Sequence, residues 1–431
     1  MPPKRYTPII RPSSPATSYK NLREWPAPTT ALAAARAYLK ECAVAQQTTL
    51  IVPDKDADGL TAGCIIRRTL LLLGLDEKHL HVHFVAKGSN VHEIEARKRM
   101  MAHNASYAIV VDQGSRPGPP LFPAIENREV VKTLLIDHHE SDEFPKDTLV
   151  LSACKHEPVA TSATLAYELC LPMHEAVPNQ CDYLCAMGTI GDLGTSFKWE
   201  PPFPDMKLCF KRWSKKAINE AVSLVNAPRR TAAFDAESAW KAIIASTSPA
   251  DILSPNNTYT RRLLAARAEV NAEVERCTHV APKFSEDGKV ALLRISSQAQ
   301  VHPVIATRWA GHLKSPRLQV VIAANNGYTP GVMHFSCRIA RQARSTVDVN
   351  IIDMLRSYAD REPGLREKMG DNFARGHKQA SGGIVKIEDF ERLWDVMTRS
   401  ETVGENREAG KRRKKDEAGQ QTLTGWLVER Q

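Results

Sequence analysis

The sequence has no long apolar run, no Cys-x-x-Cys pair and no internal repeat. Its longest apolar stretches, such as residues 69–75, fall far short of the ~20 residues that span a bilayer. The 9 cysteines are odd in number and mostly lie in apolar surroundings, which favours buried free thiols in a reducing compartment over a disulfide framework. We therefore expect a globular protein with no membrane partner.

Glycine and proline are too scarce for a disordered or collagen-like chain, and the charge is unevenly placed. Hydrophobic residues make up 42% of the 431 residues, enough chain for two or three domains. The net charge is +9, but residues 1–25 carry five Lys/Arg against one acid, and residues 399–431 carry eight against six. Because the remaining body is nearly balanced, binding to a polyanion must depend on local basic patches and the ends of the chain.

Hydrophobic periodicity predicts an α/β protein with two unequal α/β units. Apolar runs at 49–53, 80–86, 107–111 and 132–136 alternate with helical patterns at 29–39, 60–73 and 91–103, which favours a mostly parallel sheet flanked by helices. Helical, basic segments follow at 207–225, 233–245 and 260–276. Strands at 289–295, 318–325 and 332–339, with helices at 301–312 and 350–359, predict a smaller mixed α/β domain. We divide the chain into a disordered basic arm (1–25), a main domain (26–230), a helical connector (231–276), a second domain (277–398) and a disordered tail (399–431).

Four clusters of acidic or histidine residues follow predicted strands or begin helices, where open α/β sheets assemble their sites. They lie at residues 54–59, 112–114, 137–139 and 188–194. So many carboxylates at one sheet edge would repel one another unless divalent cations neutralise them, and ligation by oxygen with one or two imidazoles suits Mn²⁺ or Mg²⁺. Two such ions ~3.5–4 Å apart catalyse phosphoester hydrolysis. Any one cluster alone is also compatible with a turn or a calcium-like loop.

These clusters resemble motifs I to IV of the DHH phosphoesterase superfamily. The Asp-x-Asp-x-Asp-Gly form of the first is closer to RecJ-like exonucleases than to the small-substrate branch, in which the motif begins with a histidine. The resemblance continues in Asn226-Ala-Pro-Arg-Arg230, in Ser336-Cys-Arg338, and in the glycine-rich segment 375–383, which is similar to the Gly-Gly-His signature of the DHH-associated C-terminal domain. It covers residues ~45–395 and assigns the main domain as the DHH catalytic domain. Arg375 stands where the family has the first glycine of that signature.

The resemblance implies a role for each matching residue. His139 would stabilise the charge that develops on the scissile phosphate, and Asp137 would orient the histidines. Asp112 would bridge two ions. The implied metal ligands are Asp54, Asp56, Asp58, Asp112, His138 and Asp192, and the implied substrate-binding residues are Asn226, Arg230, Ser336, Arg338, Arg375, Gly376 and His377. Alternatives are that His139 is a structural histidine and that the glycines only make turns.

Three further segments suggest partners. Lys207 to Arg230 combines cations with Phe210 and Trp213, as a single-strand track requires, although a solvated helix face has the same composition. The basic run 411–415 is typical of a nuclear import signal or of a solvated charge run. The spacing of Gln420, Leu423, Trp426 and Leu427 fits the box that docks on the sliding clamp PCNA, or an incidental amphipathic end.

Together these patterns predict a nuclear, Mn²⁺- or Mg²⁺-dependent exonuclease that acts on single-stranded nucleic acid and is recruited to PCNA in replication or repair. Two alternatives remain open. One is a phosphodiesterase on short oligonucleotides or small phosphate esters, because the same metal core serves both. The other is a non-catalytic, PCNA-tethered scaffold, against which the intact ligand set argues.

Overall fold

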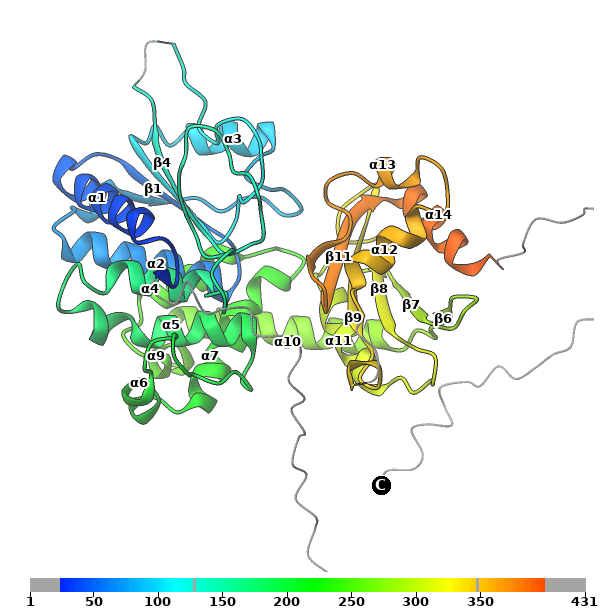
Figure 1. The fold of residues 1–431 in the computed structure, drawn as a ribbon. Helices are drawn as coiled ribbons and strands as arrows, with labels where there is room; N and C mark the ends of the chain where they lie inside the picture. The colour runs from blue at the N-terminus through cyan, green and yellow to red at the C-terminus, as the bar shows by residue number, and fades with distance from the viewer. Residues whose placement is uncertain (1–23, 127–128, 346–348, 400–431) are drawn as a thin grey trace, which may run out of the picture.

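A computed structural model describes residues 24–126, 129–345 and 349–399, which form two α/β lobes joined by a long helix (Figure 1). The predicted arm and tail therefore lie almost wholly outside the described residues, as do the basic run and the clamp box. No helix among the described residues has the length and apolarity to cross a membrane. All nine cysteines are free, and all but Cys154 are buried, as expected.

The first lobe is built on a five-stranded, fully parallel sheet with the order β2-β1-β3-β4-β5. Its central strands are buried on both faces, because alternate residues enter two different cores. Ile51, Ile109 and Ile136 pack against α1, α2, α4 and α5, whereas Val110 and Leu135 pack on the side of α3. The strands are β1 (Thr49–Pro53), β2 (Leu80–Val82), β3 (Tyr107–Val111), β4 (Lys132–Asp137) and β5 (Leu149–Ser152).

The helices of this lobe agree with the predicted segments at α1 to α3, but two interpretations change. The predicted basic helix is two helices, because Ser214 caps a new one at its N-terminus. Part of the predicted connector belongs to the first core, where Trp240 and Ile252 are buried. The helices are α1 (Thr29–Ala45), α2 (Ala57–Leu72), η2 (Glu77–His79), α3 (Ile94–Met101), α4 (Ser162–Cys170), α5 (Val177–Leu193), α6 (Lys207–Arg212), α7 (Lys215–Asn226), η3 (Pro228–Arg230), α8 (Ala236–Ile244) and α9 (Pro249–Leu253).

The second lobe contains a six-stranded mixed sheet with the order β10-β11-β9-β8-β7-β6, in which only β7 and β8 are parallel neighbours. Helix α11 covers one face, and α12 and α14 cover the other. This is the predicted smaller α/β domain. Its elements are β6 (Lys283–Phe284), β7 (Val290–Ile295), α11 (His302–His312), β8 (Val320–Asn325), β9 (Val332–Ile339), η4 (Ala343–Ser345), α12 (Ile351–Ala359), α13 (Leu365–Met369), β10 (Arg375–His377), β11 (Ala380–Lys386) and α14 (Ile387–Thr398).

Helix α10 (Thr258–Thr278) connects the lobes, because Leu263 is buried in the first core and Val270 and Val274 in the second. A second connection comes from Lys87, whose Nζ donates to the carbonyl oxygens of Ala232 and Gln298, at 3.2 and 2.5 Å. Its ammonium also lies 4.3 Å from the centre of the Tyr328 ring, a cation–π contact with the second lobe. These contacts hold the second sheet beside the carboxyl edge of the first.

Candidate metal centre

Acidic residues gather at the carboxyl edge of the parallel sheet, as expected. Asp54 and Asp56 follow β1, Asp112 follows β3, and Asp137 ends β4. Asp112 has a left-handed backbone, with φ of 62°, so its carboxylate turns away from the strand direction. Asp192 comes from the C-terminal end of α5. The sequence had predicted a position at a strand end or a helix start.

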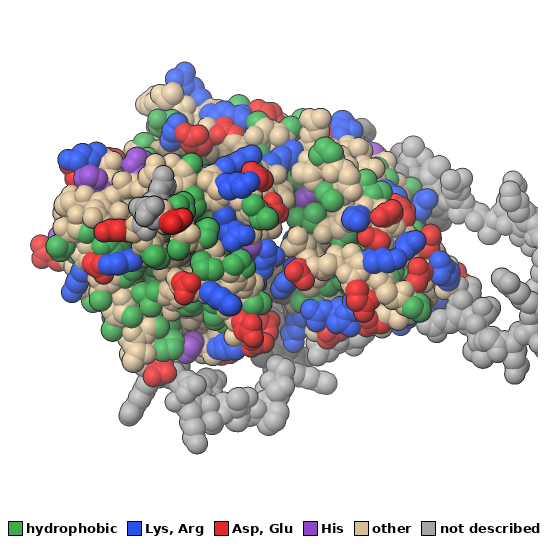
Figure 2. All heavy atoms as spheres, turned by 90° about the horizontal axis from the view of Figure 1, so that it is seen from above, with side chains coloured by type: hydrophobic (Ala, Val, Ile, Leu, Met, Phe, Trp, Pro, Cys, Tyr) green, Lys and Arg blue, Asp and Glu red, His purple; other side chains and the backbone are tan. Residues whose placement is uncertain are grey.

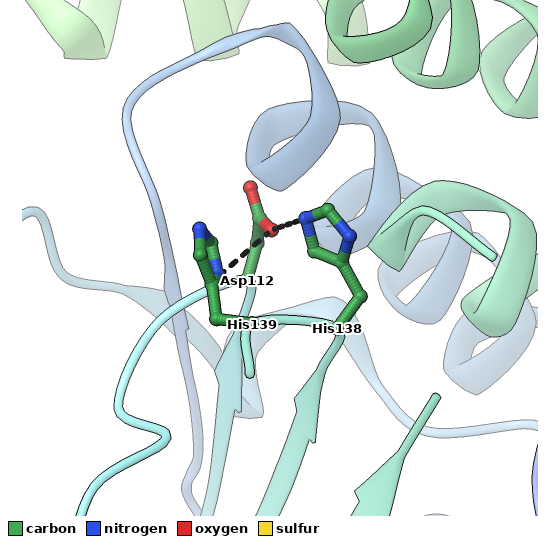
Figure 3. A group of neighbouring side chains, drawn as sticks. All are labelled: Asp112, His138 and His139. Atoms are coloured by element: carbon green, nitrogen blue, oxygen red, sulfur yellow. Dashed lines mark ion pairs between the residues drawn. The ribbon is translucent and has the colours of Figure 1, made fainter. Parts of the chain in front are cut away.

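These side chains form three groups whose ligand atoms all lie within 4.8 Å of one another. The groups are Asp54–Asp56–Asp112, Asp112–His138–His139 and Asp58–His138–Asp192. Asp112 is shared by two groups and His138 by two, and Figure 3 shows Asp112 between the two imidazoles. The structure thus brings together the side chains of all six predicted metal ligands, and Asp112 belongs to two of the three groups.

Asp58 and Asp112 are buried and held by the N-terminal turn of α4. The backbone N–H groups of Ser162 and Ala163 donate to the two oxygens of Asp58, at 2.7 and 3.0 Å, and the Ser162 hydroxyl donates to Asp112 at 2.8 Å. Burial, reinforced by the charge of Asp192, raises the pKa of Asp58 to about 7. Burial and then the charge of Asp58 raise the pKa of Asp112 well above its usual value. The ionised forms of these two carboxylates are therefore disfavoured together at this edge of the sheet unless a cation neutralises them.

His138 lies at the centre of these acids. Its Nε2 is 3.3 Å from an oxygen of Asp192 and 3.4 Å from one of Asp112. Burial acts to lower the pKa of His138, but the contacts with Asp112 and Asp192 outweigh it and raise the pKa well above the usual value. A positive charge is therefore favoured at the place where these ligands converge.

Asp137 is fully buried and organises the Asp-His-His segment. One of its oxygens accepts the backbone N–H of His138 at 2.8 Å and faces Nδ1 of His139 at 2.8 Å, and the other accepts the N–H of Ser115. Partial burial opposes the charge on His139, but the hydrogen bond to Asp137 raises its pKa to about 9. With Nδ1 held in this way, Nε2 of the half-exposed His139 ring is left to meet a ligand.

The glycines of the first and fourth motifs allow close packing around the ligands. A Cβ on Gly188 of α5 would lie 2.5 Å from Oγ1 of Thr61 and 2.6 Å from Oδ1 of Asp58. A Cβ on Gly59 would lie 2.8 Å from the backbone of Asp54. Any side chain at these positions would displace α5 or α2 from the metal centre.

A cationic cluster lies between the lobes, close to Asp56. Asn226 accepts N–H groups from Ala57 at 3.2 Å and from Arg229 at 3.1 Å, so its amide oxygen positions the end of α7 against the start of α2. Arg229 also donates to Gln300 and lies 3.8 Å from Asp56. Sequence reasoning did not select Arg229 as a site residue, although its place beside Arg230 was a signal.

Arg230 and Arg338 add buried guanidinium groups from the two lobes. Burial, helped by the charges of Arg229 and Arg338, lowers the pKa of Arg230 to about 9, and burial also lowers the pKa of Arg338. Arg338 donates to the hydroxyl of Ser336 at 2.9 Å. Figure 2 shows Lys and Arg side chains along the hollow between the lobes. Partly desolvated cations that repel one another would be stabilised by a nearby anion.

The glycine-rich segment forms the edge of the second sheet, not only turns. Gly382 and Gly383 lie in β11, where a Cβ would clash with Phe335, while Gly376 has φ of 106°. Arg375 is exposed and its Nε donates to the carbonyl oxygen of Asp371 at 2.6 Å. His377 ends β10, opposite Ala380.

The predicted single-strand track changes in one respect. Phe210 and Trp213 pack against the first core, and Arg212 pairs with Asp182, so these aromatic rings are used in folding.

Ser162 was not selected from the sequence, because nothing in its local pattern shows that α4 begins beside Asp58.

The fold and the site define an α/β protein with an acidic, histidine-containing centre able to bind divalent metal ions. Residues 48–189 match the model of the DHH family, N-terminal domain. The single-stranded-DNA-specific exonuclease RecJ of Thermus thermophilus is 30% identical over 155 residues, which are 34% of this chain. The chain spans about a fifth of that relative, 22% of its length.

Solved structures extend the likeness of fold to both lobes. A crystal structure of exonuclease RecJ bound to manganese has a TM-score of 0.55 at 19% identity, covering 85% of this chain and 93% of that one. RecJ of Thermus thermophilus in complex with Mn²⁺ has a TM-score of 0.58 at 19% identity, covering 86% of this chain and 54% of that one.

Proposed function

We propose that this chain is a metal-dependent phosphodiesterase that hydrolyses single-stranded nucleic acid from an end, with two Mn²⁺ or Mg²⁺ ions as cofactors. The observation that carries the proposal is the sharing of Asp112 between two groups of ligand atoms. The donor set fits these ions, because carboxylate oxygens predominate and only one imidazole, that of His138, contributes. When bound, two such cations activate water and stabilise charge on a phosphoryl group.

The protein's own residues would act around that centre. Asp54, Asp56, Asp58, Asp192 and His138 would hold the ions, and Asp112 would bridge them. His139 would donate a hydrogen bond from Nε2 to the phosphate oxygen on which charge develops, and Asp137, bonded to Nδ1, would keep the ring in that orientation.

The buried cations between the lobes favour a substrate with a phosphorylated end. Arg230 and Arg338 come from different lobes, and an end phosphate between them would offset the repulsion and the cost of burial. Asn226 and Ser336 would position the arginines, as their hydrogen bonds to Arg229 and Arg338 suggest. One lobe would cut and the other would hold the strand end.

The test is hydrolysis by the full chain with Mn²⁺, using DNA and RNA oligonucleotides of several lengths labelled at the 5′ or the 3′ end. Mononucleotide release from one end of single strands supports the proposal, and the label that is released first gives the polarity. Cleavage of dinucleotides or small phosphate esters alone would favour the small-substrate alternative. No metal-dependent hydrolysis of any substrate would favour the scaffold.

We also propose that the protein acts in a nucleus and is recruited to PCNA, on the sequence of residues 411–415 and of Gln420, Leu423, Trp426 and Leu427. These residues lie outside the described ones, so the support is the spacing alone. Calorimetric titration of a peptide of residues 419–431 against PCNA tests the second part, and absence of binding at high micromolar peptide would remove the clamp.

A further inference from the structure

A cluster of histidines lies on β2, an edge strand of the first sheet, and just beyond the end of α3. Residues 79–83 read His-Leu-His-Val-His, and alternate residues of a strand point to opposite faces. The leucine and the valine of this stretch pack against the core that contains α1 and α2. His81 and His83 therefore point to the other face, which α3 covers and where His103 follows that helix.

The rings of His83 and His103 meet at the spacing of two ligands on one metal ion. Nδ1 of His83 lies 3.1 Å from Nε2 of His103, and the two ring centroids lie 5.2 Å apart at an interplanar angle of 79°. Two imidazole nitrogens that bind a tetrahedral zinc ion at ~2.0–2.1 Å are about 3.3–3.4 Å apart, and their ring centroids are about 5 Å apart. Small rotations of the two rings would therefore let an ion enter between the facing nitrogens.

His81 supplies a third imidazole to the same place. Its ring centroid lies 6.4 Å from that of His103, and its side chain is exposed. The separation is about 1 Å more than that of two rings bound to one tetrahedral ion, and rotation about the χ angles of an exposed side chain covers this difference. Three imidazoles and a water molecule complete a tetrahedral set of ligands.

The protonation of the rings favours metal binding. Burial, helped by the neighbouring His103 and Arg99, lowers the pKa of His83 to about 4, and burial with the neighbouring His81 lowers the pKa of His103. The neutral imidazole is the form that binds a metal ion, so protons do not compete for these nitrogens near neutral pH. Arg99 is exposed, and its guanidinium can extend into solvent away from a bound cation.

We propose that His81, His83 and His103 bind a Zn²⁺ ion at a site separate from the candidate metal centre. Imidazole ligands suit Zn²⁺, whereas the carboxylate-rich centre suits Mn²⁺ and Mg²⁺. His81 pairs with Leu50 of β1, four residues before Asp54, which separates the two sites by about 13 Å along the strand. The ion would join the end of α3 to β2, an edge strand that pairs with β1 through only three residues. Because this ligand set exists only in the folded chain, Zn²⁺ would stabilise the edge of the sheet.

The experiment measures binding of Zn²⁺ to the full chain in saturating Mg²⁺ by calorimetry, and binding of Co²⁺ by visible absorption. His83→Ala and His103→Ala should each bind one equivalent of Zn²⁺ fewer than the wild type and lose the intense bands of four-coordinate Co²⁺. His81→Ala should weaken the same binding event without abolishing it, because water replaces one of three protein ligands. Any Zn²⁺ that enters the carboxylate centre does so equally in all variants and cancels in the comparison.

The matched control is His312→Ala, since His312 is exposed at the end of α11 in the other lobe. It should bind as many equivalents of Zn²⁺ as the wild type. A second measurement needs no variant: Zn²⁺ should protect His81 and His103 of the wild type from modification by diethyl pyrocarbonate, which mass spectrometry of peptides detects. Equal Zn²⁺ stoichiometry in the wild type and the His83 and His103 variants, or equal modification with and without Zn²⁺, would overturn the inference and leave the contact between the two rings as a hydrogen bond.

Discussion

The left-handed backbone of Asp112 separates two substitutions that would otherwise be equivalent. Asp112→Asn removes the charge but keeps a residue type that tolerates φ of 62°. Asp112→Ala removes the charge as well, and alanine has no polar side chain that could hydrogen-bond locally in that conformation. Alanine should cost about 1–2 kcal/mol in backbone strain, and about 1 kcal/mol more because the Ser162 hydroxyl loses its acceptor. The two variants should thus differ by about 2–3 kcal/mol in the free energy of unfolding.

Thermal unfolding in EDTA measures this difference. At about 2–4 °C per kcal/mol, the midpoint for Asp112→Ala should lie about 4–12 °C below that of Asp112→Asn. Asp112→Asn itself should unfold at or above the wild-type temperature, because it relieves repulsion with buried Asp58. Added Mn²⁺ should raise the midpoint of the wild type more than that of either variant.

The hydrolysis rates of the same two Asp112 variants test the bridging role. Both variants should lose at least about a thousandfold in rate, since the bridging ligand serves a centre that supplies several kcal/mol. Asp142→Asn is the control, because Asp142 is exposed and pairs with Lys155 at the surface. Equal midpoints in EDTA for the asparagine and alanine variants would refute the strain argument, and wild-type turnover in Asp112→Asn would refute the bridging role.

Three further predictions test the rest of the site. Arg338→Ala or Arg230→Ala should raise KM roughly ten- to hundredfold for end-phosphorylated strands while Mn²⁺ affinity stays unchanged, which steady-state kinetics and calorimetry check; loss of bound metal would show that the second lobe has another role. Gly188→Ala should destabilise the chain by about 1–3 kcal/mol and weaken Mn²⁺ binding, whereas Gly311→Ala on α11, where a Cβ meets open space, should not; equal unfolding midpoints would contradict the packing argument. Replacing Leu423 and Trp426 by alanine should abolish clamp binding in a pull-down with PCNA and leave the rate on free oligonucleotides unchanged; unaltered clamp binding would reject the box.

The parts of the fold predicted from the sequence are those with a local signal. Strands β1, β3 and β9 were placed with their observed bounds, because β1 and β3 are short, strongly apolar runs and β9 alternates apolar with polar residues. The bounds of helix α5 were not predicted, because the helix is buried over most of its length and lacks the polar stripe of an amphipathic helix. For this reason Asp192 was expected near a strand end or helix start, although it lies at the end of this helix.

The site shows the same division. The acidic motifs could be found because their residue types and spacing carry the chemistry, and the structure brings their side chains together. Ser162 could not, because its importance depends on tertiary contacts with Asp58 and Asp112. Strands β10 and β11 were missed because glycine weakens the β pattern, and only pairing with β9 shows why glycine is needed there.

Helix α10 sets the rotation of the second lobe relative to the first, and with it the position of Arg338 relative to Arg230. Its 21 residues extend over about 31 Å, with Leu263 fixed in one core and Val270 in the other. One residue inserted between them would advance the second lobe by about 1.5 Å and rotate it by about 100°, carrying Arg338 away from Arg230. An insertion of seven residues would nearly restore the angle but would separate the lobes by about 10 Å. The length of a helix that contributes no ligand is therefore as tightly constrained as the identity of the arginines themselves.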